Sequence, residues 1–140
     1  MLHMTKLCVG ITDIAHLRQR QQARQAAGEV LRHQTRSFPR RAAEVIDGGS
    51  LYWVIGGAMV VRQRVIDIAE AVYDDGTRCA ALVFDAELVP VAARPTRAFQ
   101  GWRYLDPASA PPDLVAGQVA EGSDALPAAL RRELEHLGLL

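Results

Sequence analysis

The longest β-favouring stretch of the chain is residues 48–73, which read GGSLYWVIGGAMVVRQRVIDIAEAVY. Residues 50–55 are continuously apolar and predict a buried strand, and the glycine pair that follows predicts a bend or tight hairpin. Residues 58–73 are too long for a flat strand of ordinary length. Their alternation also changes sides, because two arginines and two isoleucines fall on one face. The pattern therefore predicts a long strand that bends around a small barrel.

The C-terminal half of the pattern predicts more strands and one helix. Residues 74–76 (Asp-Asp-Gly) form a strong hairpin signal, and residues 77–89 read as the returning partner strand. Aromatic residues in 98–105 predict a strand that closes the sheet. Residues 106–124 are rich in Pro, Ala, Gly and Asp and predict a surface loop, whereas residues 125–137 carry a leucine stripe typical of a helix.

The N-terminal part predicts a strand, a helix, a short strand and a second helix. Residues 4–10 are short and apolar, as in a strand. Thr12 can cap a helix that ends near Gly28, and this helix turns rich in Gln and Arg after its first turns, so it must lie on the surface. Residues 30–36 fit a short strand or an extended link. Pro39 favours the first turn of a short helix over residues 39–46.

This order of elements predicts an α+β fold: a small curved antiparallel sheet or β-barrel, flanked by helices and followed by a C-terminal helix. The 140 residues suit one domain, with a core over about residues 3–105 and a C-terminal loop and helix over residues 106–140. Apolar residues make up 49% of the chain and charged residues 23%, as in ordinary globular proteins. Neither a membrane span nor a signal peptide can be read, so we expect a cytoplasmic location and no membrane partner.

Charge is distributed unevenly although the formal net charge is zero. Residues 1–41 carry eight Lys or Arg side chains and two carboxylates, whereas the remaining 99 residues carry eight Arg and fourteen Asp or Glu. This split indicates a basic face that meets a polyanionic partner, or two halves that neutralise each other across the fold.

Arginines and aromatic residues together define a candidate ligand site. Flat rings beside arginines suit the stacking of a base, with positive charge for phosphate, and a helix start adds free N–H groups. The predicted ligand-binding residues are Arg36, Ser37, Phe38, Arg40, Arg41, Tyr52, Trp53, Trp102 and Arg103. The predicted contacts to a nucleic-acid backbone are Arg18, Arg20, Arg24, Arg62 and Arg64. The alternative is that the arginines are solvated or paired with acids, and that the aromatic side chains pack in the core.

Catalytic and cofactor signals are weak. Cys8 lies in an apolar strand and lacks the electropositive, accessible setting that a nucleophilic thiol needs. Asp85 and Glu87 share a strand face but have no recognisable partner for acid–base work. Lys6 is the best candidate for lysine chemistry. The two cysteines and four histidines show no metal-ligand spacing, so we expect no metal, no cofactor and no catalytic residue.

Distinctive motifs resemble a bacterial family catalogued as domain of unknown function 1489. They are KLCVG (residues 6–10), TRSFPRRAAEVIDGGSLYWVI (35–55), RQR (62–64), LVFDAELV (82–89) and FQGWRYL (99–105). The resemblance covers roughly residues 3–115. The family has no established activity, so this resemblance implies no catalytic residues.

Residues 36–52 are also similar to part of the EVE domains of the PUA-like superfamily. Both have an Arg-containing aromatic run, a short helix, a glycine turn and an aromatic strand. The chain departs from that pattern where Gly-Gly-Ser replaces the usual Gly-Asp, and where the first strand lacks a Trp. The similarity implies a PUA-like barrel that binds nucleic acid, with a pocket near Ser37, Phe38, Tyr52 and Trp53.

The sequence thus favours a non-enzymatic module that binds RNA, DNA or a nucleotide, including one with a modified base. Two alternatives stay open: a protein-interaction or structural module, and a small enzyme acting on a nucleotide-like or amide substrate. The oligomeric state is open, with a homodimer among the possibilities.

Overall fold

The computed structural model describes residues 1–114 of the chain. Its elements, in chain order, are β1 (His3–Leu7), α1 (Ile14–Ala26), β2 (Arg32–Thr35), α2 (Ala42–Ile46), β3 (Ser50–Ile55), β4 (Ala58–Val72), β5 (Arg78–Pro95), β6 (Trp102–Leu105) and the 3-10 turn η1 (Pro107–Ser109). The architecture is α+β, as the sequence predicts. The predicted C-terminal helix over residues 125–137 lies outside the described residues.

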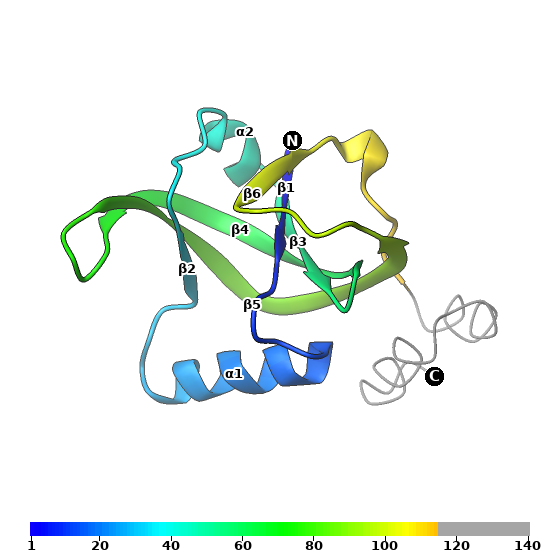
Figure 1. Ribbon diagram of the computed structural model, residues 1–140, viewed down its shortest axis with the longest axis horizontal. Coiled ribbons are helices and arrows are strands. Elements are labelled where there is room, and N and C mark those ends of the chain that lie inside the picture. The colour runs from blue at the N-terminus through cyan, green and yellow to red at the C-terminus, as the bar shows by residue number, and fades with distance from the viewer. Residues whose placement is uncertain (115–140) are drawn as a thin grey trace.

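The six strands form a single mixed sheet in the order β2-β5-β4-β3-β1-β6 (Figure 1). Four neighbouring pairs are antiparallel, but β1 runs parallel to β3, with Met4 opposite Leu51. The prediction of a wholly antiparallel sheet is therefore wrong. The parallel pair arises because α1, β2 and α2 carry the chain from the end of β1 back to its beginning before β3 starts.

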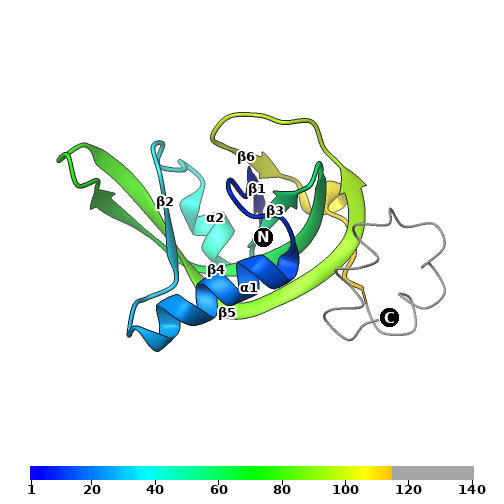
Figure 2. The same ribbon diagram turned by 60° about the horizontal axis from the view of Figure 1, so that its bottom comes forward.

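The sheet curls strongly but does not close into a barrel within the described part of the chain. Register shifts lie beside Met59, Gln63 and Val65, and these irregularities bend the long β4–β5 ribbon (Figure 2). The edge strands β2 and β6 form no ladder with each other. The chain just after β2 does meet β6, because Trp102 Nε1 donates a hydrogen bond of 2.9 Å to Ser37 O. The curved sheet is thus confirmed and the closed barrel is not formed.

The two helices lie near opposite ends of the curled sheet (Figure 1). Asp13, rather than the predicted Thr12, caps α1: its side chain accepts a hydrogen bond of 2.6 Å from His16 N. Ile14 and Leu17 are the buried residues of α1, so this helix is mainly a surface element, as its polar sequence predicts. α2 begins at Ala42 and not at residue 39. Neither helix described is long and apolar enough to cross a membrane.

β5 continues to Pro95, six residues beyond the predicted end of the strand at residue 89. The prediction ended there because Pro90 lacks the N–H group of a regular ladder. In the structure β2 pairs only with Ala80 to Val83, and at Pro90 the same edge of β5 meets the segment after η1 through an isolated bridge between Val91 and Asp113. Pro90 takes part through its carbonyl, which accepts a hydrogen bond of 3.0 Å from Leu114 N, and a proline is tolerated at such an edge because no regular ladder needs its N–H group.

Hydrophobic cores lie on both faces of the sheet. The larger core includes Leu51 and Trp53 of β3 together with Ile14 and Leu17 of α1. The smaller core lies on the opposite face and includes Tyr52 and Val54 of β3. Successive strand residues point to opposite faces, which explains this division along β3. The helix-covered face positions the candidate site.

Candidate functional site: a cationic pocket at the open side of the sheet

A pocket of about 270 Å³ lies between α1, β2 and the C-terminal end of β1. β6 begins opposite Lys6, so β1 has no β6 partner from Leu7 onwards. β2 is the other edge of the sheet. The pocket therefore occupies part of the opening that a closed barrel would have filled with paired strands.

Four cationic side chains line this pocket: Lys6, Arg20, Arg24 and Arg32. None of the described lining residues is acidic. The Lys6 ammonium donates to Gly101 O at 3.5 Å, and Arg24 Nη1 donates to Arg32 O at 3.5 Å, so two of the cations are held by main-chain oxygens rather than carboxylates. We call this site the cationic pocket.

Aromatic rings form the floor of the cationic pocket. Trp53 is only 4% exposed and packs edge-on against His33 and Phe84, with ring centroids 5.5 Å and 5.8 Å away. The indole Nε1 donates to Gln63 Oε1 at 3.2 Å. Because Trp53 is almost fully buried, a ligand contacts little of its ring, whereas the half-buried His33 ring and the guanidinium planes remain for stacking.

An amide pair fixes the helix above this floor. Gln63 is fully buried and exchanges two hydrogen bonds with Gln21 of α1, of 2.8 Å and 2.9 Å. Its Nε2 also donates to Asp85 O at 2.8 Å. With the Trp53 bond, both donors and both acceptor positions of Gln63 are used. This network holds α1, β3, β4 and β5 in one arrangement beneath the pocket.

Burial changes the acid–base properties of three lining residues. It raises the pKa of the Cys8 thiol to about 12, although Lys6 works in the opposite direction, so the thiol stays protonated at neutral pH. Burial, assisted by Lys6 and Arg24, lowers the pKa of His33 to about 4. Burial also lowers the pKa of Lys6. Because the thiol and the imidazole are neutral, the positive charge of the pocket comes from its lysine and arginines.

The structure brings together only some of the sequence-predicted residues. Arg20, Arg24 and Trp53 line the cationic pocket. Tyr52 belongs to the smaller core on the other face, where its ring packs edge-on against His3 with centroids 5.1 Å apart. Tyr52 and Trp53 therefore do not share the pocket that the EVE resemblance implies, because neighbours on a strand point to opposite faces.

Residues around the start of α2 are engaged with β6. Trp102 Nε1 donates to Ser37 O, and its ring packs edge-on against Tyr104, with centroids 4.8 Å apart. Arg41 pairs with Glu44 at 2.5 Å and 2.8 Å, and its guanidinium lies 5.7 Å from the centre of the Tyr104 ring. The Arg41 hydrogen bond lowers the pKa of Glu44. These contacts brace the start of α2 and give Arg41 an internal partner.

Four other predicted residues lie away from the cationic pocket. Arg36 and Phe38 line a separate hollow beside the β4–β5 hairpin. Arg40 is exposed. Arg103 lies on β6, where its guanidinium stands 4.6 Å from the centre of the Phe99 ring. The structure thus divides the single predicted site into several places.

The arginines predicted to contact a nucleic-acid backbone also separate. Arg62 forms a bidentate ion pair with Asp113, at 2.6 Å and 2.7 Å, and donates to Ser50 Oγ at 3.1 Å. Its hydrogen bond lowers the pKa of Asp113. Arg64 and Arg18 are exposed and outside the cationic pocket. Arg62 therefore holds the segment after η1 against the sheet. Of the arginines predicted to contact a nucleic-acid backbone, Arg20 and Arg24 line the cationic pocket.

Sequence reasoning missed Arg32, His33, Gln21 and Gln63, and considered Lys6 only for catalysis. One signal was available on α1, where Gln21 lies four residues after Leu17, on the stripe that begins with buried residues. A polar side chain that continues an apolar stripe points towards the interior. The residues of β2 gave no such signal, because their environment depends on strands far away in sequence.

Within residues 1–114, no group of three or more His, Cys, Asp or Glu side chains is placed to hold a metal ion. A family described as "Protein of unknown function (DUF1489)" matches residues 4–140, nearly the whole chain. The chain belongs to the DUF1489 family. Neither a curated protein nor a solved structure shows significant similarity to this DUF1489 protein. Its relation to EVE domains therefore stays a prediction.

Proposed function

We propose that this DUF1489 protein is a non-enzymatic module that binds a nucleotide unit, free or within a nucleic acid, in the cationic pocket. The observation that carries the proposal is the composition of the pocket wall: four cationic side chains, none of the described lining residues acidic, and a floor of aromatic rings. A phosphate attracts such cations, and a planar base suits guanidinium and imidazole faces.

The size of the pocket limits the ligand. Its volume of about 270 Å³ is close to the lower end of the roughly 300–1,000 Å³ that is usual for ligand sites. A single base with its sugar and phosphate suits this space, whereas a stacked duplex does not. The proposal therefore favours a mononucleotide or one unstacked nucleotide of a strand.

The protonation states favour binding over catalysis. The Cys8 thiol, with its pKa raised to about 12, is a poor nucleophile at neutral pH. His33, with its pKa lowered to about 4, has no carboxylate beside it in the described lining of the pocket to hold it as a general base. The neutral imidazole can instead accept or donate one hydrogen bond to a base.

Charge reversal on α1 tests the proposal. Arg24 lines the pocket and Arg18 is exposed on the same helix outside it, so Arg18→Glu is a matched control for Arg24→Glu. Binding of 5′-nucleotides and short single strands is measured by calorimetry at low salt. We expect Arg24→Glu to weaken binding at least about tenfold, the value of a charge-assisted hydrogen bond, while Arg18→Glu stays within about twofold.

Two results would count against the proposal. One is an absence of binding by the unaltered protein to every nucleotide and oligonucleotide tried at low salt. The other is an equal loss in both variants, which would indicate a general charge effect rather than a pocket. Circular dichroism of each variant checks that the fold is intact.

A further inference from the structure

A second hollow, of about 430 Å³, lies beyond the far end of β2 from the cationic pocket. It is lined by Arg36, Phe38, Arg78 and Val72, among others. Phe38 is 44% exposed, so part of its ring is open to a ligand. We call this site the Phe38 hollow; the binding of a single nucleotide in the cationic pocket makes no use of it.

A third, larger hollow joins the two sites. It shares Arg32 and His33 with the cationic pocket, and it shares Glu70 and Ala71 with the Phe38 hollow. Shared lining residues mean that the three hollows adjoin one another along β2. Arg32 and Arg36 are four residues apart, which is roughly 13 Å along an extended chain. This separation exceeds the length of one nucleotide and suits a short strand.

The charges along this path favour attachment at its two ends. Arg24 and Arg32 stand at one end, and Arg36 and Arg78 at the other. The carboxylates Glu29 and Glu70 line the hollow between them, and Glu70 also borders the Phe38 hollow, where Arg36 and Arg78 outnumber it.

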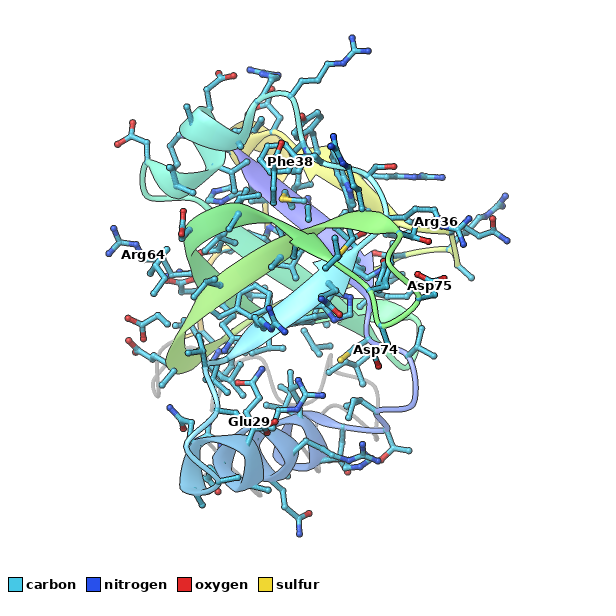
Figure 3. All side chains as sticks on the ribbon, turned by 90° about the vertical axis from the view of Figure 1, so that its left-hand side faces the viewer. Glu29, Arg36, Phe38, Arg64, Asp74 and Asp75 are labelled. Atoms are coloured by element: carbon cyan, nitrogen blue, oxygen red, sulfur yellow. The ribbon has the colours of Figure 1, made fainter. Side chains whose placement is uncertain are left out.

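Figure 3 shows the same order from the side of the hairpin: Glu29 lies near α1, Arg36 lies by the hairpin turn with Asp75, and Phe38 lies further towards α2. Hydrogen bonds with Thr77 are the main cause of the lowered pKa of Asp75, and the charge of Arg36 lowers this pKa further by a smaller amount. Arg64 lies on the other side of this view, away from the path.

We propose that the ligand of this protein is a short single strand of nucleic acid that follows β2, with one nucleotide in the cationic pocket and another base on Phe38. The inference rests on the proposed function of the cationic pocket and extends it. Stacking of bases on aromatic side chains is tolerant of sequence and is common in proteins that bind single strands. Arg32 and Arg36 contact the phosphates between the two bases.

The test is a length series of single-stranded oligonucleotides, from the mononucleotide to the hexanucleotide, in RNA and DNA forms, measured by calorimetry at low salt. We expect affinity to rise with length until both ends of β2 are covered, and then to level off. Phe38→Ala is expected to weaken hexanucleotide binding about tenfold, in line with the loss of one stacked base. The same change is expected to leave mononucleotide binding within about twofold, because Phe38 does not line the cationic pocket.

Matched controls come from two exposed residues of β4 that line none of the three hollows. Ile66 is an exposed apolar residue outside all three hollows, so Ile66→Ala controls for Phe38→Ala. Arg36→Ala is expected to weaken hexanucleotide binding because it removes a phosphate contact, and Arg64→Ala is its control, since both arginines are exposed and Arg64 lies off the path. The two controls are expected to leave hexanucleotide binding within about twofold. Thermal melting verifies that all four variants are folded.

The outcomes separate the two proposals. If the mononucleotide binds and the hexanucleotide binds no more tightly, the strand along β2 is refuted and the single-nucleotide site stands. If Phe38→Ala weakens the hexanucleotide no more than Ile66→Ala does, the Phe38 hollow is not a base site. If neither nucleotides nor oligonucleotides bind, both proposals fail.

Discussion

Gln63 is the residue whose replacement tests most directly how the floor of the cationic pocket is held. It is fully buried and uses all four of its hydrogen-bonding positions, with Gln21, Trp53 and the main chain of Asp85 as partners. Gln63→Leu keeps a side chain of similar size but removes every one of these bonds. The loss in the free energy of unfolding then depends on the partners that are left without a hydrogen bond, rather than on Gln63 itself.

The indole N–H of Trp53 is left without an obvious substitute, because this side chain is only 4% exposed, whereas Asp85 is an exposed residue. A buried polar group without a partner costs about 1–3 kcal/mol, and the two lost bonds with Gln21 add about 1–2 kcal/mol, so we expect Gln63→Leu to lower the free energy of unfolding by roughly 2–5 kcal/mol. Gln21→Ala removes only the two bonds between the amides, and we expect a loss of about 1–2 kcal/mol.

Urea denaturation followed by circular dichroism measures both losses, with Gln22→Ala, an exposed neighbour on α1, as the control. The control is expected to stay within about 0.5 kcal/mol of the unaltered protein. Because the two amides are in contact, the double variant should lose less than the sum of the single losses. A loss below about 1 kcal/mol for Gln63→Leu, or one no larger than that of Gln21→Ala, would refute the reasoning.

Two further predictions concern stability. A Cβ atom at Gly49 would lie 2.0 Å from Leu2 O and 2.4 Å from Val45 O, and main-chain oxygens cannot rotate away, so Gly49→Ala should cost about 3 kcal/mol or more. Gly56→Ala meets open space at φ +61° and should cost only about 1–2 kcal/mol; equal melting temperatures for the two variants would contradict this account. The pKa of His33 is lowered to about 4 in the folded protein. As the pH falls from about 6.5 to about 4, the unfolded chain therefore binds a proton at His33 and the folded protein does not. The free energy of unfolding should therefore fall by up to about 3 kcal/mol over this pH window. His33→Gln should remove this part of the loss, as measured by denaturation curves at pH 7, 5.5 and 4.5. An unchanged pH dependence in the variant would count against a neutral, buried His33.

Much of the local structure was readable because it depends on neighbours in sequence. The hairpin turn after β4 follows from Asp-Asp-Gly, and the polar surface helix α1 follows from the scarcity of apolar residues after Leu17. The bend in β4 was also predictable, since the alternation of residues changes sides there. The separation of Tyr52 from Trp53 could also have been predicted from the sequence, because the two residues are adjacent on a strand and must point to opposite faces.

The partners of individual arginines show where local reasoning stops. Arg41 pairs with Glu44 three residues away, a spacing that a short helix allows. Arg62 pairs with Asp113, 51 positions along the chain, and nothing near Arg62 in the sequence indicates that carboxylate. Both arginines were predicted to contact a ligand, and both have internal partners that the residue type alone does not reveal.

By itself, the sequence of this DUF1489 protein determined its α+β class, the order of its elements and the concentration of positive charge in its first 41 residues. Only the tertiary structure decided that β1 pairs in parallel with β3, that the curled sheet stays open, and that Lys6, Arg24 and Arg32 line one pocket. The physical reason is one of range. Turn chemistry and periodicity act over a few residues, whereas strand order and pocket walls are set by packing between segments that are distant along the chain.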